Sequence, residues 1–257
     1  MISILYDIFK KWSAKGSVYI ISDPHFNDAE SFEFRTASGK LPENITTVKA
    51  LADYQVKCIN DVCHKNDTLI CLGDVGDIEY VKKLKAGYKV LILGNHDRGA
   101  DYYKREILTV IRCPECGCTK LIDLGDNDGM SLYKTQCSKC HFVGFTFGND
   151  FYAKDDNRLF DEVYSGPLMI SDKILLSHEP IIPCPDCIVN LCGHVHANGH
   201  KFKVDGHKYY NFCAEAIDYK PVSLGELIKK GLLSKVKDIH EVTVAGAVER
   251  KKRRTRD

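Results

Sequence analysis

The sequence has almost no net charge and no long apolar run, and both absences limit what the protein does. Its 36 Lys and Arg residues nearly balance 35 Asp and Glu residues, leaving a formal net charge of +1 at pH 7. A nearly neutral molecule does not draw in nucleic acid or a membrane surface through its overall field, so such a partner must bind a local patch. No stretch approaches the roughly 18 apolar residues of a membrane-spanning helix, and no basic segment precedes the short apolar run at the N-terminus. We therefore expect a cytoplasmic protein that does not bind membranes.

Internal repeats and low-complexity tracts are also lacking, so the fold must be built from individual strands and helices. A chain of 257 residues is long enough for one large domain and a small module. Apolar, β-rich runs alternate with helical patterns, which is typical of βαβ units in an α/β protein with helices outside a layered sheet. The expected strands lie within 17–23, 67–75, 88–97, 168–180, 188–200 and 207–216, and the expected helices within 46–65 and 77–87. Ser171-Asp172 is expected to form a hairpin turn inside 168–180.

Side chains that bind metals gather in five loops, each at the end of a predicted strand. These loops hold five of the ten histidines. They are Asp23-Pro24-His25, Gly73-Asp74 with Asp77, Gly94-Asn95-His96-Asp97, Ser177-His178-Glu179 and Gly193-His194-Val195-His196. Sheets of α/β proteins place ligands and catalytic groups at strand ends. One such loop is weak evidence, but five in order indicate a metal site.

The ordered set D-x-H, G-D-x-x-D, G-N-H-D, a single His after a strand, and G-H-x-H resembles the calcineurin-like metallophosphoesterase superfamily. The motifs span residues 23–196, and the similarity to small bacterial and phage-type members continues through "NFCAEAIDYKPVSLGEL". The resemblance implies a layered β-sandwich flanked by helices, within the α/β class, and a site for two metal ions.

The resemblance also implies a role for each ligand. Asp23, His25 and His196 would bind one metal, Asn95, His178 and His194 would bind the other, and Asp74 would bridge the two. Imidazole nitrogen mixed with carboxylate or carbonyl oxygen suits Mn, Fe, Zn or Ni, whereas Mg or Ca prefer oxygen alone. Two divalent ions close together lower the pKa of water and hold a bridging hydroxide, which we expect to be the nucleophile.

Hydrolysis of an ester also requires a proton for the leaving oxygen. His96 stands beside the expected ligand Asn95 and is the candidate general acid, with Asp97 expected to set its tautomer and orientation. Arg98, Arg35 and Asn27 are weaker candidates for contact with phosphate, because only their position in loops supports them.

Twelve cysteines occur in a chain without an export signal, which favours metal ligands or free thiols in a reducing compartment over disulfides. Cys113, Cys116, Cys137 and Cys140 have the C-x2-C-x20-C-x2-C spacing of a four-thiolate structural zinc site. The runs "TKLIDLGD" and "SLYKTQ" between the pairs predict a hairpin around "NDG", so we expect a zinc ribbon in which Cys118 is spare. Three roles are open for it: a structural insertion, a gate over the metal cleft, or a contact for nucleic acid or protein.

These patterns divide the chain into three parts. A discontinuous metallophosphoesterase domain is expected over 1–111 and 147–240, the zinc ribbon over 112–146, and a basic tail over 241–257. The tail cluster of Lys251, Lys252, Arg253, Arg254 and Arg256 either binds phosphate backbones or is simply solvated.

The hypothesis that follows is an enzyme: a two-metal phosphoesterase acting on mono- or diesters, with nucleotides and nucleic-acid ends among the candidate substrates. A protein phosphatase is the alternative within enzymes. The alternative from another class is a catalytically silent scaffold that uses the ribbon to bind nucleic acid or protein.

Overall fold

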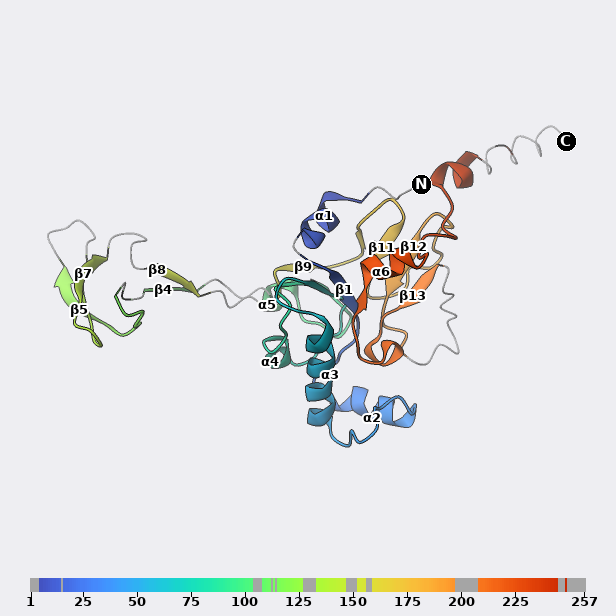
Figure 1. Ribbon diagram of the computed structural model, residues 1–257. Helices are drawn as coiled ribbons and strands as arrows, with labels where there is room; N and C mark the ends of the chain where they lie inside the picture. The colour runs from blue at the N-terminus through green and yellow to red at the C-terminus, as the bar shows by residue number, and fades with distance from the viewer. Residues whose placement is uncertain are drawn as a thin grey trace. The chain divides into compact units, whose positions relative to one another are not determined.

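A computed structural model describes residues 5–14, 16–103, 108–111, 113, 115–126, 133–146, 152–155, 159–196, 208–244 and 248. The chain forms two compact units, a larger one of Met1–Lys104 with Leu159–Asp257 and a smaller one of Arg105–Arg158 (Figure 1). The basic cluster of the tail, for which the sequence predicts phosphate binding or simple solvation, lies outside the described residues.

The larger unit contains two sheets. Strand order in the five-stranded sheet is β14-β1-β2-β3-β9, with β1, β2, β3 and β9 parallel and β14 antiparallel to β1. Strand order in the other sheet is β10-β11-β12-β13, where β10 and β11 form the predicted hairpin and β11, β12 and β13 are parallel. The bounds are β1 Val18–Ile21, β2 Thr68–Cys71, β3 Tyr88–Ile92, β9 Glu162–Tyr164, β10 Leu168–Met169, β11 Ile174–Leu176, β12 Val189–Cys192, β13 Tyr209–Asn211 and β14 Val222–Ser223.

Three helices of this unit follow residues whose side chains cap them. Asp28, Thr47 and Ser223 each accept a hydrogen bond from a backbone N–H three residues later, which satisfies a donor that the first turn leaves free. The helices are α1 Asp7–Ser13, α2 Ala29–Ala37, α3 Val48–Val62, α4 Ile78–Val81, α5 Ala100–Tyr103 and α6 Leu224–Lys229, with a 3₁₀ turn, η1, at Ala214–Ile217.

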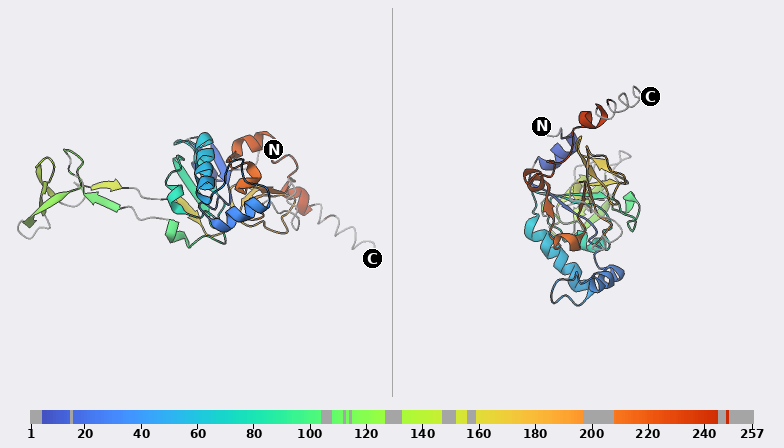
Figure 2. Two further views of the ribbon diagram at one scale, coloured as in Figure 1. Left: turned by 90° about the horizontal axis from the view of Figure 1, so that it is seen from below. Right: turned by 90° about the vertical axis from the view of Figure 1, so that its right-hand side faces the viewer.

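The core of the larger unit has two layers because successive strand residues face opposite sides of a sheet. On β2, Leu69 and Cys71 belong to one buried cluster with Leu51 and Ile59 of α3. Residues from the other face of the five-stranded sheet, such as Ile70, pack with β11 and β12 of the second sheet and with α1 and α6. The two sheets are therefore stacked, and α3 covers the outer face of the five-stranded one (Figures 1 and 2). The predicted layered α/β fold is confirmed.

The helix predicted over 77–87 is much shorter than expected. It ends after Val81, and the chain continues in turns. The side chain of Asn60 on α3 donates to the carbonyl of Lys83 and accepts from the N–H of Lys85. These tertiary hydrogen bonds replace those of a further helical turn. The local sequence pattern does not reveal them because Asn60 is distant in sequence.

The smaller unit is built from antiparallel strands. β5 Leu121–Asp126, β6 Tyr133–Cys137 and β7 Val143–Thr146 form a three-stranded sheet, and β4 Leu108–Ile111 pairs with β8 Tyr152–Asp155. The unit contains the predicted ribbon 112–146 and adds the β4–β8 pair on both sides of it. The expected turn at "NDG" lies outside the described residues.

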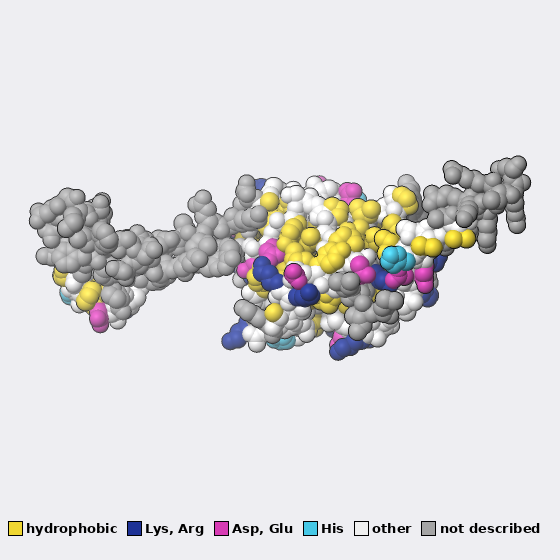
Figure 3. Space-filling model, turned by 90° about the horizontal axis from the view of Figure 1, so that it is seen from above, with side chains coloured by type: hydrophobic (Ala, Val, Ile, Leu, Met, Phe, Trp, Pro, Cys, Tyr) yellow, Lys and Arg dark blue, Asp and Glu magenta, His cyan; other side chains and the backbone are white. Residues whose placement is uncertain are grey.

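The surface of the larger unit carries both hydrophobic and charged side chains. Hydrophobic side chains gather over the middle of the face seen in Figure 3, with charged side chains at the edges of that area. Among the described residues, no helix is both long and apolar enough to cross a membrane.

Glu162 at the start of β9 joins the N-terminal helix to the five-stranded sheet. Its carboxylate accepts four side-chain hydrogen bonds, from Lys11, Trp12, Tyr88 and Tyr164. Burial raises the pKa of Glu162, but these hydrogen bonds outweigh it and bring that pKa down to about 2. The indole of Trp12 is only 2% exposed, so its N–H depends on this carboxylate.

Replacing Glu162 by Gln is expected to lower the melting temperature by a few degrees at pH 7 and by less at pH 3. Because the folded pKa lies below the unfolded value of about 4.3, the ionised carboxylate stabilises the fold above that pH. This contribution is lost as the pH falls toward 2. Thermal unfolding followed by circular dichroism measures it, with Glu79→Gln, an exposed glutamate on α4, as the control. If Glu162→Gln lowered the melting temperature equally at pH 7 and pH 3, the ionised carboxylate of Glu162 would not be what stabilises the fold.

Candidate metal centre

The predicted ligand loops converge because they follow neighbouring strands at one end of each sheet. The loops after β1, β2 and β3 come from the five-stranded sheet, and those after β11 and β12 from the other. Backbone hydrogen bonds tie neighbouring loops together, from the N–H of Asp23 to the carbonyl of Gly73, from His25 to Asp74, and from Gly193 to His178. Convergence of the loops is thus built into the strand order.

The first cluster joins Asp23, His25, Asp74 and His196. Nε2 of His25 lies 4.0 Å from Oδ1 of Asp23 and 3.5 Å from Oδ2 of Asp74. Nε2 of His196 lies 3.6 Å from the same Asp23 Oδ1. Two imidazole nitrogens and two carboxylate oxygens therefore face a common point.

The second cluster joins Asp74, Asn95, His178 and His194. Oδ1 of Asn95 lies 2.8 Å from Nε2 of His178 and 3.0 Å from Nδ1 of His194. The two imidazole nitrogens are 3.2 Å apart, and Nε2 of His178 is 3.4 Å from Oδ2 of Asp74. All seven predicted ligands thus fall into two adjoining groups of the predicted composition.

Asp74 belongs to both clusters through a single oxygen. Its Oδ2 faces His25 on one side and His178 on the other, while Oδ1 accepts the backbone N–H of His96 at 2.9 Å. Burial raises the pKa of Asp74, but the hydrogen bond and charge of His178, with the N–H of His96, bring it down to about 2. The carboxylate is therefore ionised over the physiological range.

Two buried ligand atoms have no hydrogen-bond partner within the described part of the chain. They are Oδ1 of Asp23 and Nε2 of His25, both in the first cluster. The other oxygen of Asp23 accepts from Ser22 Oγ, from the N–H of His194 and from Cys213 Sγ, so the carboxylate is held with Oδ1 facing the cluster. Because an unpaired buried polar atom is costly, these two atoms fit a site that binds a cation.

The backbone at the ligands is strained. Asp23, His25, Asp74, His194 and His196 all have positive φ, between 44° and 65°. Residues other than glycine rarely occupy this region, and such strain concentrates at functional sites. A side chain is also excluded at two motif glycines. A Cβ at Gly193 would lie 2.1 Å from Oδ2 of Asp23, and one at Gly94 would lie 2.2 Å from Oδ1 of Asp74.

One hydrogen bond to a backbone carbonyl orients the imidazole of His178. Its Nδ1 lies 2.7 Å from the carbonyl oxygen of Leu72, so Nδ1 carries the proton that it donates there and Nε2 faces the second cluster. Burial lowers the pKa of His178, but the hydrogen bond and charge of Asp74 and the charge of Asp23 raise it to about 9. A cation at this cluster therefore competes with a proton for Nε2, and its affinity falls as the pH falls.

Glu215 was not predicted from the sequence. It contacts His196 at Nδ1, the ring nitrogen on the side away from the first cluster. Oε1 of Glu215 lies 2.7 Å from Nδ1 of His196, and its Oε2 accepts from Nε of Arg35 at 3.0 Å. Burial raises the pKa of Glu215, but its hydrogen bond with His196 and the charge of Arg35 hold that pKa at about 2. Outer carboxylates of this kind orient a ligating imidazole.

Arg35 does not have the position that its sequence suggested. It is fully buried and donates to the carbonyl of Asp23 as well as to Glu215, so it braces the first ligand loop and is inaccessible to phosphate. The two other weak candidates are exposed. Asn27 donates to Asp77, and the guanidinium of Arg98 lies 4.5 Å from the ring centroid of Tyr102.

His96 is exposed at the edge of the centre, with its ring centroid 5.5 Å from that of His25. We expected Asp97 to orient this ring, but its hydrogen bonds in the described structure go elsewhere. The Asp97 carboxylate accepts from the N–H groups of Asp74, Val75 and Gly94 and from the hydroxyl of Tyr103. Asp97 therefore fastens the loop after β2 to the loop after β3, a role that local sequence does not show.

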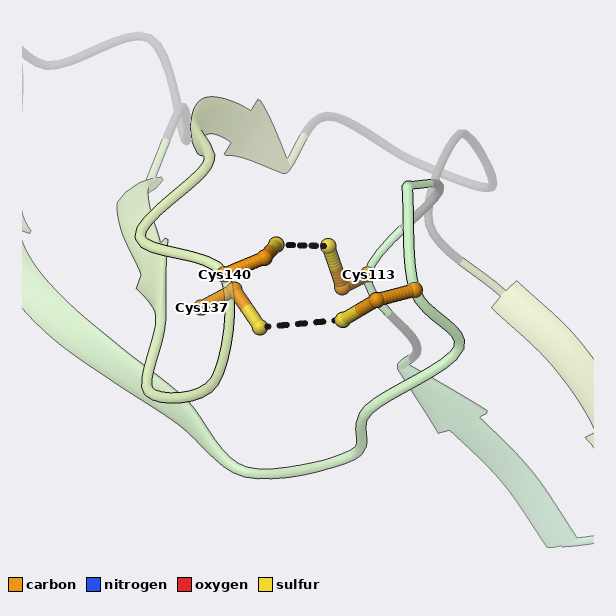
Figure 4. Close-up of side chains that lie close together, drawn as sticks. Cys113, Cys137 and Cys140 are labelled. Atoms are coloured by element: carbon orange, nitrogen blue, oxygen red, sulfur yellow. Dashed lines mark hydrogen bonds between the residues drawn. The ribbon is translucent and has the colours of Figure 1, made fainter.

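The four predicted cysteines of the smaller unit form a separate cluster. Their sulfurs lie within 4.8 Å of one another. Figure 4 shows sulfurs facing each other across a gap. The sulfurs of Cys113 and Cys140 are 3.5 Å apart, and those of Cys116 and Cys137 are also 3.5 Å apart. Backbone N–H groups of Cys140 and Lys139 help to lower the pKa of the Cys137 thiol to about 6, which favours the metal-binding thiolate.

The two cysteine turns have the same backbone geometry. The N–H of Cys113 donates to the carbonyl of Cys118, as that of Cys137 donates to Phe142. Gly117 and His141, which follow the second cysteine of each turn, have φ of 69° and 60° and donate back to the first cysteine. Two matching turns facing each other are the arrangement that a four-thiolate metal site requires.

The stacked sheets bring together two imidazole-rich clusters that share one carboxylate, and these form a candidate metal centre. The model of the calcineurin-like phosphoesterase family matches residues 16–218, and the chain belongs to this family, whose members generally hydrolyse phosphate esters with divalent metals. A search of curated proteins gave no match. A solved protein of unknown function from Aquifex aeolicus is 22% identical, with a TM-score of 0.48, over 83% of this chain and 98% of that one.

Replacing Glu215 by Gln is expected to weaken the binding of one of two Mn²⁺ ions about 10- to 100-fold, because the amide no longer supports the His196 proton with a full charge. Isothermal titration calorimetry measures both affinities, and circular dichroism checks the fold. Glu226→Gln, at an exposed position on α6, is the control. Two unchanged Mn²⁺ affinities in Glu215→Gln would rule out the supporting role.

Replacing Cys116 by Ser is expected to remove the metal ion from the smaller unit, because three thiolates and a hydroxyl bind far more weakly than four thiolates. Elemental analysis of the purified protein counts the metal per chain. Cys118→Ser is a matched control in the same turn, since Cys118 lies outside the cluster. Equal metal content in the two variants would show that Cys116 is not a ligand.

Proposed function

We propose that the protein is an enzyme that hydrolyses phosphate esters with two divalent cations at the Asp74 centre. The observation that carries this proposal is the position of Asp74 Oδ2, 3.5 Å from a nitrogen of the first cluster and 3.4 Å from a nitrogen of the second. In the proposal, the first cation is held by Asp23, His25 and His196, and the second by three further ligands. These three are Asn95, His178 and His194.

The donor set fits Mn, Fe, Zn or Ni, because each cluster combines imidazole nitrogen with carboxylate or amide oxygen. When bound, the two cations would activate water and neutralise charge on the phosphate oxygens. The residues around them supply the rest. Asp74 holds both positions, Glu215 keeps Nδ1 of His196 protonated, and His96 at the exposed edge donates a proton to the leaving oxygen.

We further propose that Arg105–Arg158 is a zinc-ribbon insertion in the phosphoesterase domain. Zinc–sulfur bonds of about 2.3 Å place the sulfurs of a tetrahedral site about 3.8 Å apart, which fits the separations seen here. Four thiolates leave no open position for water, so this site is structural. Thiols gathered for metal also fit a reducing compartment such as the cytoplasm.

The direct test is hydrolysis of p-nitrophenyl phosphate and bis-p-nitrophenyl phosphate with and without Mn²⁺. Mn²⁺ is expected to stimulate hydrolysis of at least one ester, and Asp74→Asn is expected to reduce it to background because both cations lose a ligand. Asp7→Asn, at a side chain that is 97% exposed, is the control. An inert wild-type protein with both cations bound would support a scaffold role instead.

Replacing His96 by Asn is expected to preserve Mn²⁺ binding but to slow hydrolysis by about 10²- to 10⁴-fold for esters with poor leaving groups. Esters with good leaving groups need little protonation and should be less affected. Turnover across a series of substituted phenyl esters measures this dependence, with His240→Asn at an exposed position as the control. Full activity on every ester would show that His96 is not the acid.

A further inference from the structure

In the part of the chain that the structure describes, one cavity lies against each cluster of the metal centre. The first-cluster cavity, about 210 Å³, is bordered by His25, His196 and His96. The second-cluster cavity, about 310 Å³, is bordered by Asn95 and His178. The two share no lining residue among those that the structure describes. A phosphorus atom held between the clusters would therefore have a separate space beside each of them.

The first-cluster cavity offers an aromatic surface. Phe34 of α2 lines it, partly exposed, with its ring centroid 5.3 Å from that of His196. Aromatic rings stack on such surfaces. His96, the proposed acid, lines the same cavity, so the ester arm that leaves would be the one that lies here.

The second-cluster cavity has both apolar and polar side chains in its lining. Leu93, Pro167 and Ile181 border it, together with the hydroxyl-bearing Ser165. Its volume is at the lower end of the roughly 300–1,000 Å³ of ligand pockets, which suits one ring or one sugar. It has no contact with His96, so an arm placed here would remain attached to phosphorus.

Charge in both cavities disfavours additional anionic groups. Asp28 and Glu30 line the first, and Glu179 lines the second. Neither cavity has a Lys or Arg among its described lining residues. A second phosphate on either arm would be repelled by these carboxylates, whereas a neutral ring or sugar would not.

From these observations we infer that the substrate is a phosphodiester with two compact, uncharged arms, one in each cavity. The inference rests on the proposed function and narrows it, since a monoester has one arm and leaves the second-cluster cavity filled with water. Hydrolysis breaks the bond between phosphorus and the oxygen of the arm beside Phe34. Water supplies the oxygen that forms the new bond to phosphorus and releases one proton to solvent. His96 gives one proton to the departing oxygen and regains one from solvent.

The first experiment compares bis-p-nitrophenyl phosphate with p-nitrophenyl phosphate on the full-length protein loaded with Mn²⁺. We expect kcat/KM to be at least about tenfold higher for the diester, because burial of one extra group in an apolar pocket gives about 10- to 200-fold discrimination. A monoester hydrolysed as well as the diester, or better, would overturn the inference while leaving the proposed function intact. Hydrolysis of neither ester with both cations bound would overturn the proposed function.

A second experiment fills the second-cluster cavity. Ile181→Trp is expected to reduce the diester-to-monoester ratio of kcat/KM by about tenfold, because only the diester needs that space. Ile181 is 37% exposed, so the larger side chain is tolerated, and Ile239→Trp, at a position 56% exposed, is the control. An unchanged ratio in Ile181→Trp would overturn the assignment of an arm to this cavity.

A third experiment changes the charge of the first-cluster cavity. Glu30→Lys is expected to reduce the same ratio by about threefold or more at low salt, because the added cation favours the doubly charged monoester. Glu33→Lys is the matched control, since Glu33 is also exposed on α2 but does not line the cavity. Equal ratios in the two variants would contradict the charge argument.

Discussion

The carboxylate of Asp74 is the group on which the rest of the site depends. One of its oxygens faces both clusters, and the other is held by the N–H of His96. A single ionised oxygen between two sets of imidazoles can hold two cations together only if it is rigidly placed. The surrounding structure supplies this rigidity from three directions, through Asp97, the neighbouring glycines and the buried strands.

Asp97 ties the N–H groups of Asp74 and Val75 to the loop after β3, so Asp74 cannot shift independently of that loop. Gly94 lets that loop approach Asp74 at a distance that no Cβ would permit. On the far side of the first cluster, Arg35 and Glu215 form a buried ion pair at 3.0 Å that holds both His196 and the Asp23 loop. The ligand geometry is thus maintained by hydrogen bonds to groups that do not themselves bind metal.

The positions of most strands in the larger unit, and the residues that gather in the two clusters, could be predicted from the sequence because both depend on local pattern. Apolar runs such as "TLIC" and "VNLC" differ from turns in any context, and the residues of the two clusters follow the strands directly. Glu215 could not be predicted, since it reaches His196 through η1, a turn without a strong local signal. The burial of Arg35 likewise depends on how α2 packs, and an arginine is more commonly exposed.

In the smaller unit, too, one feature could be predicted from the local sequence and another depends on tertiary structure. The spacing of its cysteines predicts a metal site, and the structure brings the four sulfurs together in two matching turns. The β4–β8 pair joins segments 152–155 and 108–111, which are far apart in sequence and carry no motif. Its contribution to the insertion could be seen only in three dimensions.

Electron paramagnetic resonance of the Mn²⁺-loaded protein tests directly whether Asp74 bridges two cations, because a shared oxygen couples the spins of two bridged ions. If Asp74 bridges the two ions, the wild-type protein will give the spectrum of an exchange-coupled Mn²⁺ pair. Asp74→Asn will not give this spectrum. The spectrum of isolated Mn²⁺ in the wild-type protein, at a stoichiometry of two ions in the larger unit, would contradict a bridge at Asp74.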